Sequence, residues 1–211
     1  MSKYFSKDKW KYMLHTVMHP MDGYYWIRHS EGKGSVPIAV LMVILFSACF
    51  TTNRLVASFV VNDIDPRAVD GIYELFAMLA FYLLLCTSNW SITCLMGGEG
   101  RMKDIAVAVG YGMFPMSVGM ALATVASKVI ADDEQAFYGL IIAAGVAYGI
   151  IMILIGIMQV HNYTLGKTLV TLFLTFVAML LIIFLVLLLG NLLGMVLNFF
   201  KSIYTELIFR V

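Results

Sequence analysis

Five long apolar segments, separated by short polar breaks, occupy most of the chain between residues 36 and 200. A helix needs about 20 apolar residues to cross a hydrocarbon core of roughly 30 Å, because backbone amides in lipid must be hydrogen-bonded within the helix. The pattern therefore predicts five transmembrane helices, and the last and longest is expected to tilt or project. We place them near Pro37 to Val60, Tyr73 to Met96, Ile105 to Ile130, Phe137 to Val160, and Thr168 to Leu197.

A β-barrel does not fit this pattern. Barrel strands alternate in polarity over about ten residues, whereas Leu180 to Leu189 is apolar at every position. The composition agrees, since 61% of residues are hydrophobic and only 13% are charged. We predict an all-α integral membrane protein, with a cytosolic segment over residues 1–35, a five-helix domain over 36–200 and a short tail over 201–211.

The segment before the first span has a different pattern, in which apolar residues recur on one helical face. These residues are Trp10, Met13, Leu14, Val17 and Met18. The spacing predicts an amphipathic interfacial helix, which Pro20 ends, and Tyr24, Tyr25 and Trp26 are expected to lie in the membrane interface. The sequence leaves open whether this helix is only a membrane anchor or also a docking face for a soluble partner.

The distribution of lysine and arginine predicts the orientation. Nine of the 14 basic residues lie before the first span or in the second and fourth loops. Because such residues concentrate on the cytoplasmic side, we expect the N-terminus inside and, after five spans, the C-terminus outside. Orientation alone accounts for these charges, but they also form a candidate inner-face patch for lipid headgroups or an acidic partner. Its residues are Lys7, Lys9, Lys11, Arg101, Lys103, His161 and Lys167.

Proline and glycine inside the spans are candidate kink or packing positions. Pro115 removes one helical hydrogen bond and predicts a kink, which is either fixed or serves as a hinge or as part of a lipid or substrate path. Glycines four residues apart allow close helix packing, within the chain or in a homodimer. The positions concerned are Gly110, Gly112, Pro115, Gly145, Gly149, Gly190 and Gly194.

Two polar residues stand out within the spans. Arg54 lies near the outer end of the first span, where its side chain can snorkel to the interface and pair with Glu74. Asn191 lies deeper, in an otherwise apolar helix. Its amide requires a hydrogen-bond partner there, so we expect a buried contact between helices.

Sequence motifs of known catalytic and metal sites are absent: there is no HExxH, GxSxG or GxxxxGK[ST]. The three cysteines, Cys49, Cys86 and Cys94, lie in or beside spans and are expected to be free thiols. We predict no catalytic residue, cofactor or metal, and no nucleic-acid partner.

The order of several short motifs resembles that of the Yip1-domain membrane proteins. The motifs are His19-Pro20 with Tyr24 to Arg28, Gly32 to Ser35, Met96 to Gly100, Tyr111 to Pro115, Gln159 to His161, and Gly166 to Thr168. The resemblance spans roughly Met18 to Leu197 and implies a five-helix fold with a cytosolic N-terminus. Eukaryotic members act in traffic between endoplasmic reticulum and Golgi and associate with Rab-type small GTPases, through or near a longer N-terminal region. The shorter segment here looks more like that of compact bacterial members, many of which lie beside transporter components.

These observations favour a non-enzymatic membrane adaptor or scaffold, with an accessory subunit of an ABC-type transport complex as one version. An autonomous small transporter, channel or lipid-binding homo-oligomer is one alternative, and a trafficking factor that binds small GTPases is another. We expect a bacterial plasma membrane as the location, and the lipid bilayer, other membrane proteins or a second copy as partners.

Overall fold

The computed structural model describes residues 6–30 and 33–209, and this part of the chain is helical throughout, with turns and no strand. Gly32 of the predicted motif, Lys3 of the basic N-terminal segment and residues 210–211 of the predicted tail lie outside the described residues. The all-α class is confirmed. In chain order the elements are α1 (Lys7–Met18), α2 (Pro20–His29), α3 (Val36–Val56), η1 (Pro66–Ala68), α4 (Gly71–Leu95), α5 (Met102–Ala126), η2 (Asp132–Glu134), α6 (Gln135–His161) and α7 (Leu165–Phe209).

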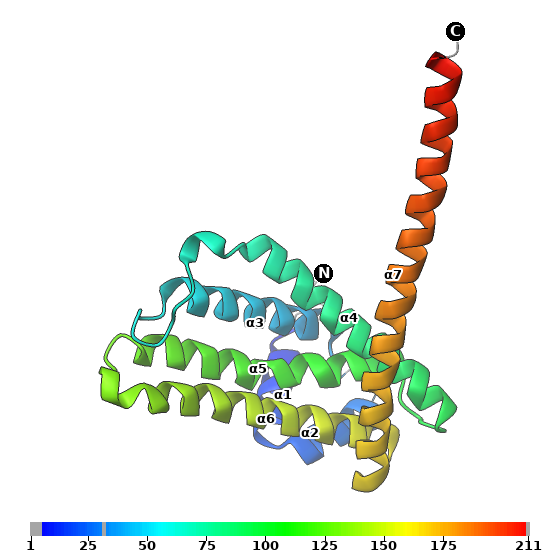
Figure 1. Cartoon of the computed structure of the whole chain (residues 1–211). Helices are drawn as coiled ribbons and strands as arrows, with labels where there is room; N and C mark the ends of the chain where they lie inside the picture. Colours follow the sequence, from blue (N-terminus) through cyan, green and yellow to red (C-terminus); the bar gives the residue numbers. More distant parts are fainter. Residues whose placement is uncertain (1–5, 31–32, 210–211) are drawn as a thin grey trace.

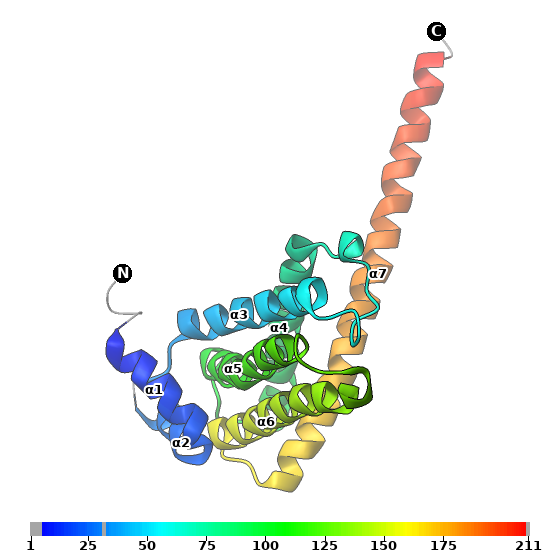
Figure 2. The same cartoon turned by 90° about the vertical axis from the view of Figure 1, so that its left-hand side faces the viewer.

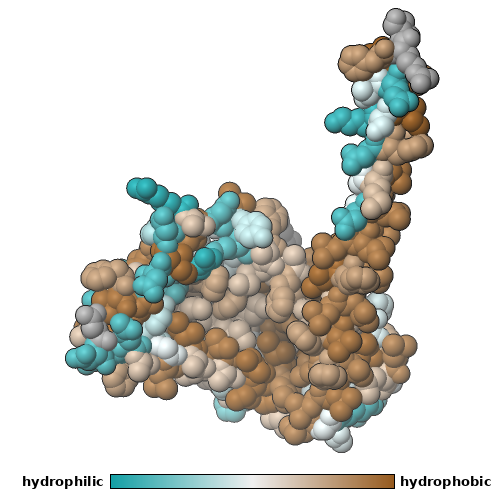
Figure 3. All heavy atoms as spheres, viewed as in Figure 1, coloured by the Kyte–Doolittle hydropathy of each residue, from teal (hydrophilic) through white to brown (hydrophobic). Residues whose placement is uncertain are grey.

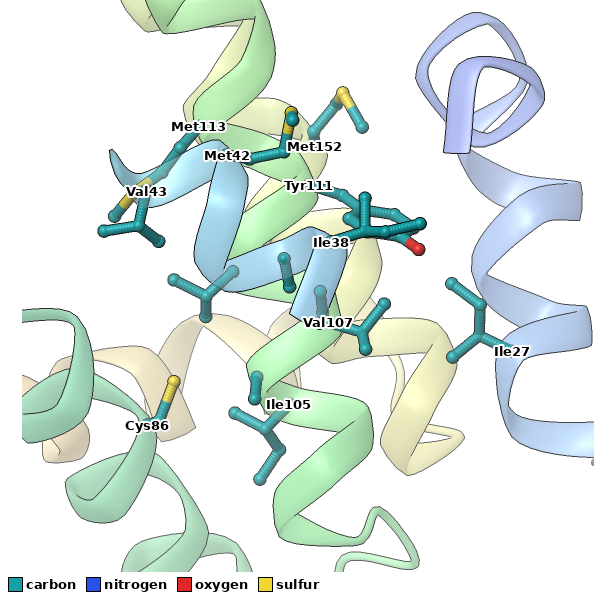
Figure 4. Packing of buried hydrophobic residues seen from close by; sticks show 14 of the residues in the cluster. Ile27, Ile38, Met42, Val43, Cys86, Ile105, Val107, Tyr111, Met113 and Met152 are labelled. Atoms are coloured by element: carbon teal, nitrogen blue, oxygen red, sulfur yellow. The ribbon is translucent and has the colours of Figure 1, made fainter. Parts of the chain in front are cut away.

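Helix α5 forms the centre of the bundle, between α3 and α6 (Figures 1 and 2). Every residue from Asp104 to Met113 is buried. Alanine and glycine in this stretch let the neighbouring helices approach closely: a Cβ built on Gly110 would lie 2.6 Å from the Cβ of Ala39. Figure 4 shows the larger side chains of α3, α5 and α6, including Met42, Met113 and Met152, packed around these contacts.

Five helices are long and apolar enough to cross a membrane, at the five predicted places. Their ends differ from the expected ones by a few residues, except in the last. Helix α7 has 45 residues and continues to Phe209, so the described part of the expected tail is helical. At 1.5 Å per residue α7 is roughly 67 Å long, about twice the thickness of a hydrocarbon core.

The direction of α7 also differs from that of its neighbours. It begins beside the ends of α4 and α6 and runs across the bundle, and its C-terminal half extends away from it (Figures 1 and 2). Its first turns bury Thr168, Thr171, Thr175 and Met179, and no described residue after Met179 is buried. Apolar side chains cover the near half of α7, whereas hydrophilic ones appear toward its far end (Figure 3).

The N-terminal segment forms two helices rather than one. Proline is favoured in the first helical turn, so Pro20 both ends α1 and begins α2. The side chain of Tyr12 donates a hydrogen bond of 2.7 Å to the Gly23 carbonyl, and burial raises the pKa of Tyr12 to about 12, which keeps this donor protonated. Gly23 leaves room for Thr16, because a Cβ there would lie 2.6 Å from the Thr16 Cα.

This hairpin packs on the bundle, which changes the expected roles of its residues. Met13 is only 1% exposed, whereas Leu14 and Met18, on the same predicted face, are 44% and 74% exposed. Tyr24 is fully buried and donates a hydrogen bond of 3.1 Å to the Ala108 carbonyl, so its expected place in the membrane interface was wrong. Tyr25 and Trp26 are exposed. The apolar face of α1 is therefore divided between the protein core and the surroundings.

Candidate functional site

Several of the sequence motifs meet at one end of the bundle, where α3 and α5 begin and α4 and α6 end; we call this the N-terminal end. The hydroxyl of Tyr111 accepts a hydrogen bond of 3.3 Å from the backbone N–H of Ser35. Tyr24 packs against Gly156 of α6, at 3.2 Å from a Cβ built there. The motifs thus specify contacts between elements that are distant in sequence.

The loop that follows α4 packs directly on His161. Gly97 has φ +65° and ends α4, and the Gly98 N–H bonds to the Thr93 carbonyl at 2.8 Å, as in a Schellman cap. A Cβ on Gly98 would lie 2.5 Å from the His161 ring, and one on Gly100 would lie 2.7 Å from Nε2. Glycine is therefore required at both positions by the close approach of the imidazole.

His161 is 1% exposed, so the expectation that it contributes to an inner-face patch for lipid headgroups or an acidic partner was wrong. Its Nδ1 lies 3.0 Å from the Ile157 carbonyl. Because a carbonyl only accepts, Nδ1 carries the hydrogen, and Nε2 has no hydrogen-bond partner among the described residues. The buried ring is held between the loop at residues 97–100 and Tyr163, on which it stacks at 5.3 Å between centroids.

A cavity of about 230 Å³ lies at the same end of the bundle and collects three of the predicted basic residues. Lys9 comes from α1, while Arg101 and Lys103 come from the start of α5. The remaining lining residues are Ile27, Gly34, Ser35, Val36, Pro37, Asp104 and Val107. The apolar side chains among them come from α2, α3 and α5, so the cavity is formed where two long apolar helices begin.

Asp104 is the carboxylate that lines this cavity, and it forms an ion pair with Arg101. The Arg101 side chain donates a hydrogen bond of 2.8 Å from Nε to Asp104 Oδ2, and the backbone N–H of Arg101 donates to the same oxygen at 3.3 Å. Asp104 is buried, whereas Arg101 and Lys103 are exposed. The pair closes the first turn of α5 and fixes the Arg101 side chain at the cavity. Among the described residues, the charged side chains that line the cavity are those of Lys9, Arg101, Lys103 and Asp104.

The other members of the predicted patch lie elsewhere. Lys7 and Lys11 are exposed on α1 and do not line the cavity. Lys167 lies over the Tyr163 ring, with Nζ 4.1 Å from the centroid. The structure therefore brings together Lys9, Arg101 and Lys103, but not the full predicted set.

At the opposite end of the bundle, Arg54 forms an ion pair with Glu74, which links α3 to α4. Thr51 donates a hydrogen bond of 2.5 Å to the other oxygen of Glu74. Nearby, the amide of Asn53 donates to Thr124 Oγ1 and accepts from the Tyr138 hydroxyl, both at 2.8 Å. This pair of hydrogen bonds joins α3, α5 and α6. The only sequence signal for it is that polar residues occur near the ends of these spans.

The glycine pairs of α6 and α7 are in different surroundings. A Cβ on Gly145 would lie 2.8 Å from the Gly119 Cα, and one on Gly149 would lie 2.6 Å from the Gly112 carbonyl oxygen, so α5 and α6 are in backbone contact. Apart from the adjacent residues and the backbone of α7 itself, no atom of the described residues lies within 4 Å of a Cβ built on Gly190 or Gly194. Asn191 is exposed beside them, where a buried contact was expected.

Helix α5 continues through Pro115, whose carbonyl oxygen packs on Gly145.

A polar contact holds the first part of α7 on α4. The amide of Asn89 donates a hydrogen bond of 3.0 Å to Thr175 Oγ1, and both side chains are buried. Thr171 and Thr175 also donate to carbonyls one turn earlier in α7, at 2.8 Å each. The sequence does not indicate this contact, because threonines at helical spacing within an apolar run do not identify their partner.

Taken together, five long apolar helices around a buried glycine-rich interface define a multi-pass helical membrane protein. The family model for the Yip1 domain matches residues 14–188. The chain therefore belongs to the Yip1-domain family, which confirms the resemblance. Neither the curated proteins nor the solved structures contain a match to it.

Proposed function

We propose that this protein is a membrane adaptor that binds helices of another membrane protein through α7. Membership of a family of non-catalytic membrane proteins supports a non-enzymatic role. The observation that carries the proposal is the contrast within α7. Its first turns pack on α4 through Asn89 and Thr175, while the apolar surface beyond Met179 has little contact with the described chain.

The small residues of this surface favour a helical partner over lipid alone. Gly190 and Gly194 leave a shallow strip with nothing within 4 Å, and Asn191 provides an amide beside it. In lipid, helices associate through close packing at small residues and through interhelical hydrogen bonds, both of which this strip offers. An accessory subunit of an ABC-type transport complex is one form of this function, with α7 against permease helices and the N-terminal end near the cytosolic domains.

Site-specific photocrosslinking in the native host tests the proposal. A benzoylphenylalanine at Leu187, which is exposed on α7 one turn before Gly190 and on the same face, is compared with one at Phe76, on the exposed face of α4. We expect a discrete adduct with one other membrane protein from Leu187 and not from Phe76, and we expect this adduct to be lost when Gly194→Leu fills the strip. Permease or ATPase subunits in the adduct would establish the transport-complex version.

The remaining outcomes separate the alternatives. An adduct only between copies of this chain would replace the adaptor by a homo-oligomer, to be tested for solute flux or lipid binding in liposomes. Adducts with lipid alone at both positions would overturn the proposal. A small GTPase recovered with the adduct would favour the trafficking role.

A further inference from the structure

We infer that a groove between α5 and α6 binds one acyl chain of a membrane lipid. The groove has a volume of about 380 Å³ and is lined by residues 114–122 of α5, residues 141–148 of α6 and Val17 of α1. Among the described residues, none from α7 lines it. The site therefore goes beyond the adaptor role, and neither depends on the other.

The lining of the groove favours a hydrocarbon. The side chains that line it are apolar except for that of Tyr148, whose hydroxyl already donates a hydrogen bond of 2.6 Å to the Val17 carbonyl. No charged side chain of the described residues lines the groove. A polar ligand would lose its hydrogen bonds to water here and gain none from the side chains, whereas a hydrocarbon chain has none to lose.

Two glycines open the space between the helices. A Cβ built on Gly145 would lie 2.8 Å from the Gly119 Cα, so the two backbones are in contact. Both glycines line the groove beside larger residues such as Val118 and Leu122, which are 40% and 57% exposed. Because glycine has no side chain, the larger neighbours border a depression along the line where α5 and α6 meet.

The length of the groove matches one leaflet of the bilayer. From residue 114 to residue 122, α5 rises roughly 12 Å at 1.5 Å per residue, and half of a hydrocarbon core is about 15 Å. Pro115 and Tyr148 lie near the middle of α5 and α6, whereas Leu122 lies near the end of α5. One chain of the leaflet at that end can lie along the groove, with its methyl end at Val17 and Tyr148.

The N-terminal hairpin favours a lipid chain over a transmembrane helix as the occupant. In the other half of the α5–α6 pair, Tyr24 packs on Gly156 and donates a hydrogen bond to the Ala108 carbonyl. The hairpin thus covers the half nearer the N-terminal end and leaves the other half open (Figure 1). A helix that crossed the whole core along the groove would meet Val17, whereas a lipid chain can end there. The groove also continues the lipid-facing surface of two spans, so lipid enters it directly.

The test is photocrosslinking of the purified full chain in phosphatidylcholine vesicles. The probe is a phosphatidylcholine with a diazirine near the methyl end of one acyl chain, and peptide mass spectrometry locates the adducts. Ala144→Leu fills the groove from α6. Ala143→Leu is the matched control, because Ala143 is also exposed on α6 but does not line the groove. Leu83, in the middle of α4, reports ordinary lipid contact, since it is 57% exposed.

In the unmodified chain we expect adducts at Val118 to exceed those at Leu83 about tenfold, which corresponds to a preference of about 1.4 kcal/mol, although Leu83 is the more exposed. Ala144→Leu should reduce the Val118 adducts to the level at Leu83, and Ala143→Leu should leave them unchanged. Thermal midpoints establish that both variants are folded.

Three results would overturn the inference. In the unmodified chain, adducts that follow side-chain exposure alone would show that the groove has no preference for a lipid chain, whatever the variants do. Equal effects of Ala144→Leu and Ala143→Leu would show that the preferred chain does not lie in the groove. Crosslinks between copies that replace the Val118 adducts as the protein-to-lipid ratio rises would assign the groove to a second copy of this chain.

Discussion

Single side chains join the helices at both ends of the bundle, and the clearest case is the ion pair of Arg54 and Glu74. Glu74 is 7% exposed and also accepts a hydrogen bond from Thr51. Arg54 has 30% of its side chain exposed, so it keeps access to the interface. The buried carboxylate of Glu74 therefore needs its charged partner more than the partly exposed guanidinium of Arg54 does.

Removal of the arginine is expected to be more harmful than removal of the glutamate. Arg54→Met leaves a buried carboxylate without its cation and should lower the free energy of unfolding by about 3 kcal/mol. Glu74→Gln leaves a cation that can turn toward the interface and should cost less. Thermal midpoints in detergent measure both, with Glu99→Gln in an exposed loop as the control. Equal losses in the two variants would show that the asymmetry of burial does not matter.

The glycines of α6 and α7 allow a direct comparison between packed and open positions. Gly145→Ala places a methyl group 2.8 Å from the Gly119 Cα, and this overpacking should cost about 1–3 kcal/mol. The clash exceeds the roughly 0.5–1 kcal/mol that alanine gains over glycine in a helix, since the contacting atom is backbone. Gly190→Ala meets no atom within 4 Å and should leave the thermal midpoint of the isolated chain unchanged or slightly raised. The prediction fails if the two substitutions have similar effects on the purified monomer.

At the level of elements, α1 was predicted from its spacing, but the division of its apolar face was not. Met13→Lys would place a charge in the core and should release α1 from the bundle, whereas Leu14→Lys should leave it docked. Limited proteolysis of the first 30 residues measures this, and we expect cleavage of the Met13 variant to be at least about tenfold faster. Similar rates for both variants would mean that α1 is held by the membrane and not by the bundle.

The junction of α4 and α7 depends on a hydrogen bond between two elements that are far apart in sequence. A double-mutant cycle with Asn89→Leu and Thr175→Val should give a coupling energy of about 0.6 kcal/mol, the typical value for a polar contact between membrane helices. The cycle with Thr205→Val in place of Thr175→Val should give no coupling energy, because the Thr205 hydroxyl donates to the Lys201 carbonyl of its own helix and has no other hydrogen bond to the described residues. A coupling energy of zero in both cycles would show that the Asn89–Thr175 hydrogen bond does not hold α7 on α4.

Element positions were largely predictable, because a run of about 20 apolar residues has few alternatives in a membrane. Helix α2 was not predicted, because a proline after a helical pattern indicates the end of one helix and can equally begin the next. The site was predictable only in part. Charge patterning indicated Lys9, Arg101 and Lys103, but the burial of His161 depends on two glycines in another loop, and spacing along one segment carries no information about that contact.

At the scale of the whole molecule, the orientation in the membrane is still a prediction. With Cys49, Cys86 and Cys94 replaced by alanine, single cysteines are introduced at Lys7, Lys103, Asp133 and Ser202. A membrane-impermeant maleimide on intact cells should label the last two and not the first two, as the distribution of basic residues predicts. Labelling of Lys103→Cys but not Asp133→Cys would invert the orientation, and protection of Ser202→Cys would show that α7 does not carry the C-terminus outside.

The attachment of the N-terminal hairpin also constrains when the fold can be completed during synthesis. The Val17 carbonyl accepts a hydrogen bond from Tyr148, 131 residues later in the chain, and Tyr24 donates to Ala108, 84 residues later. At translation rates of about 5–20 residues per second, the hairpin residue Val17 is synthesised roughly 7–26 s before Tyr148. During that interval the apolar face of the hairpin must rest on lipid or on the insertion machinery. The amphipathic character of α1 thus serves a nascent chain that still lacks its own core.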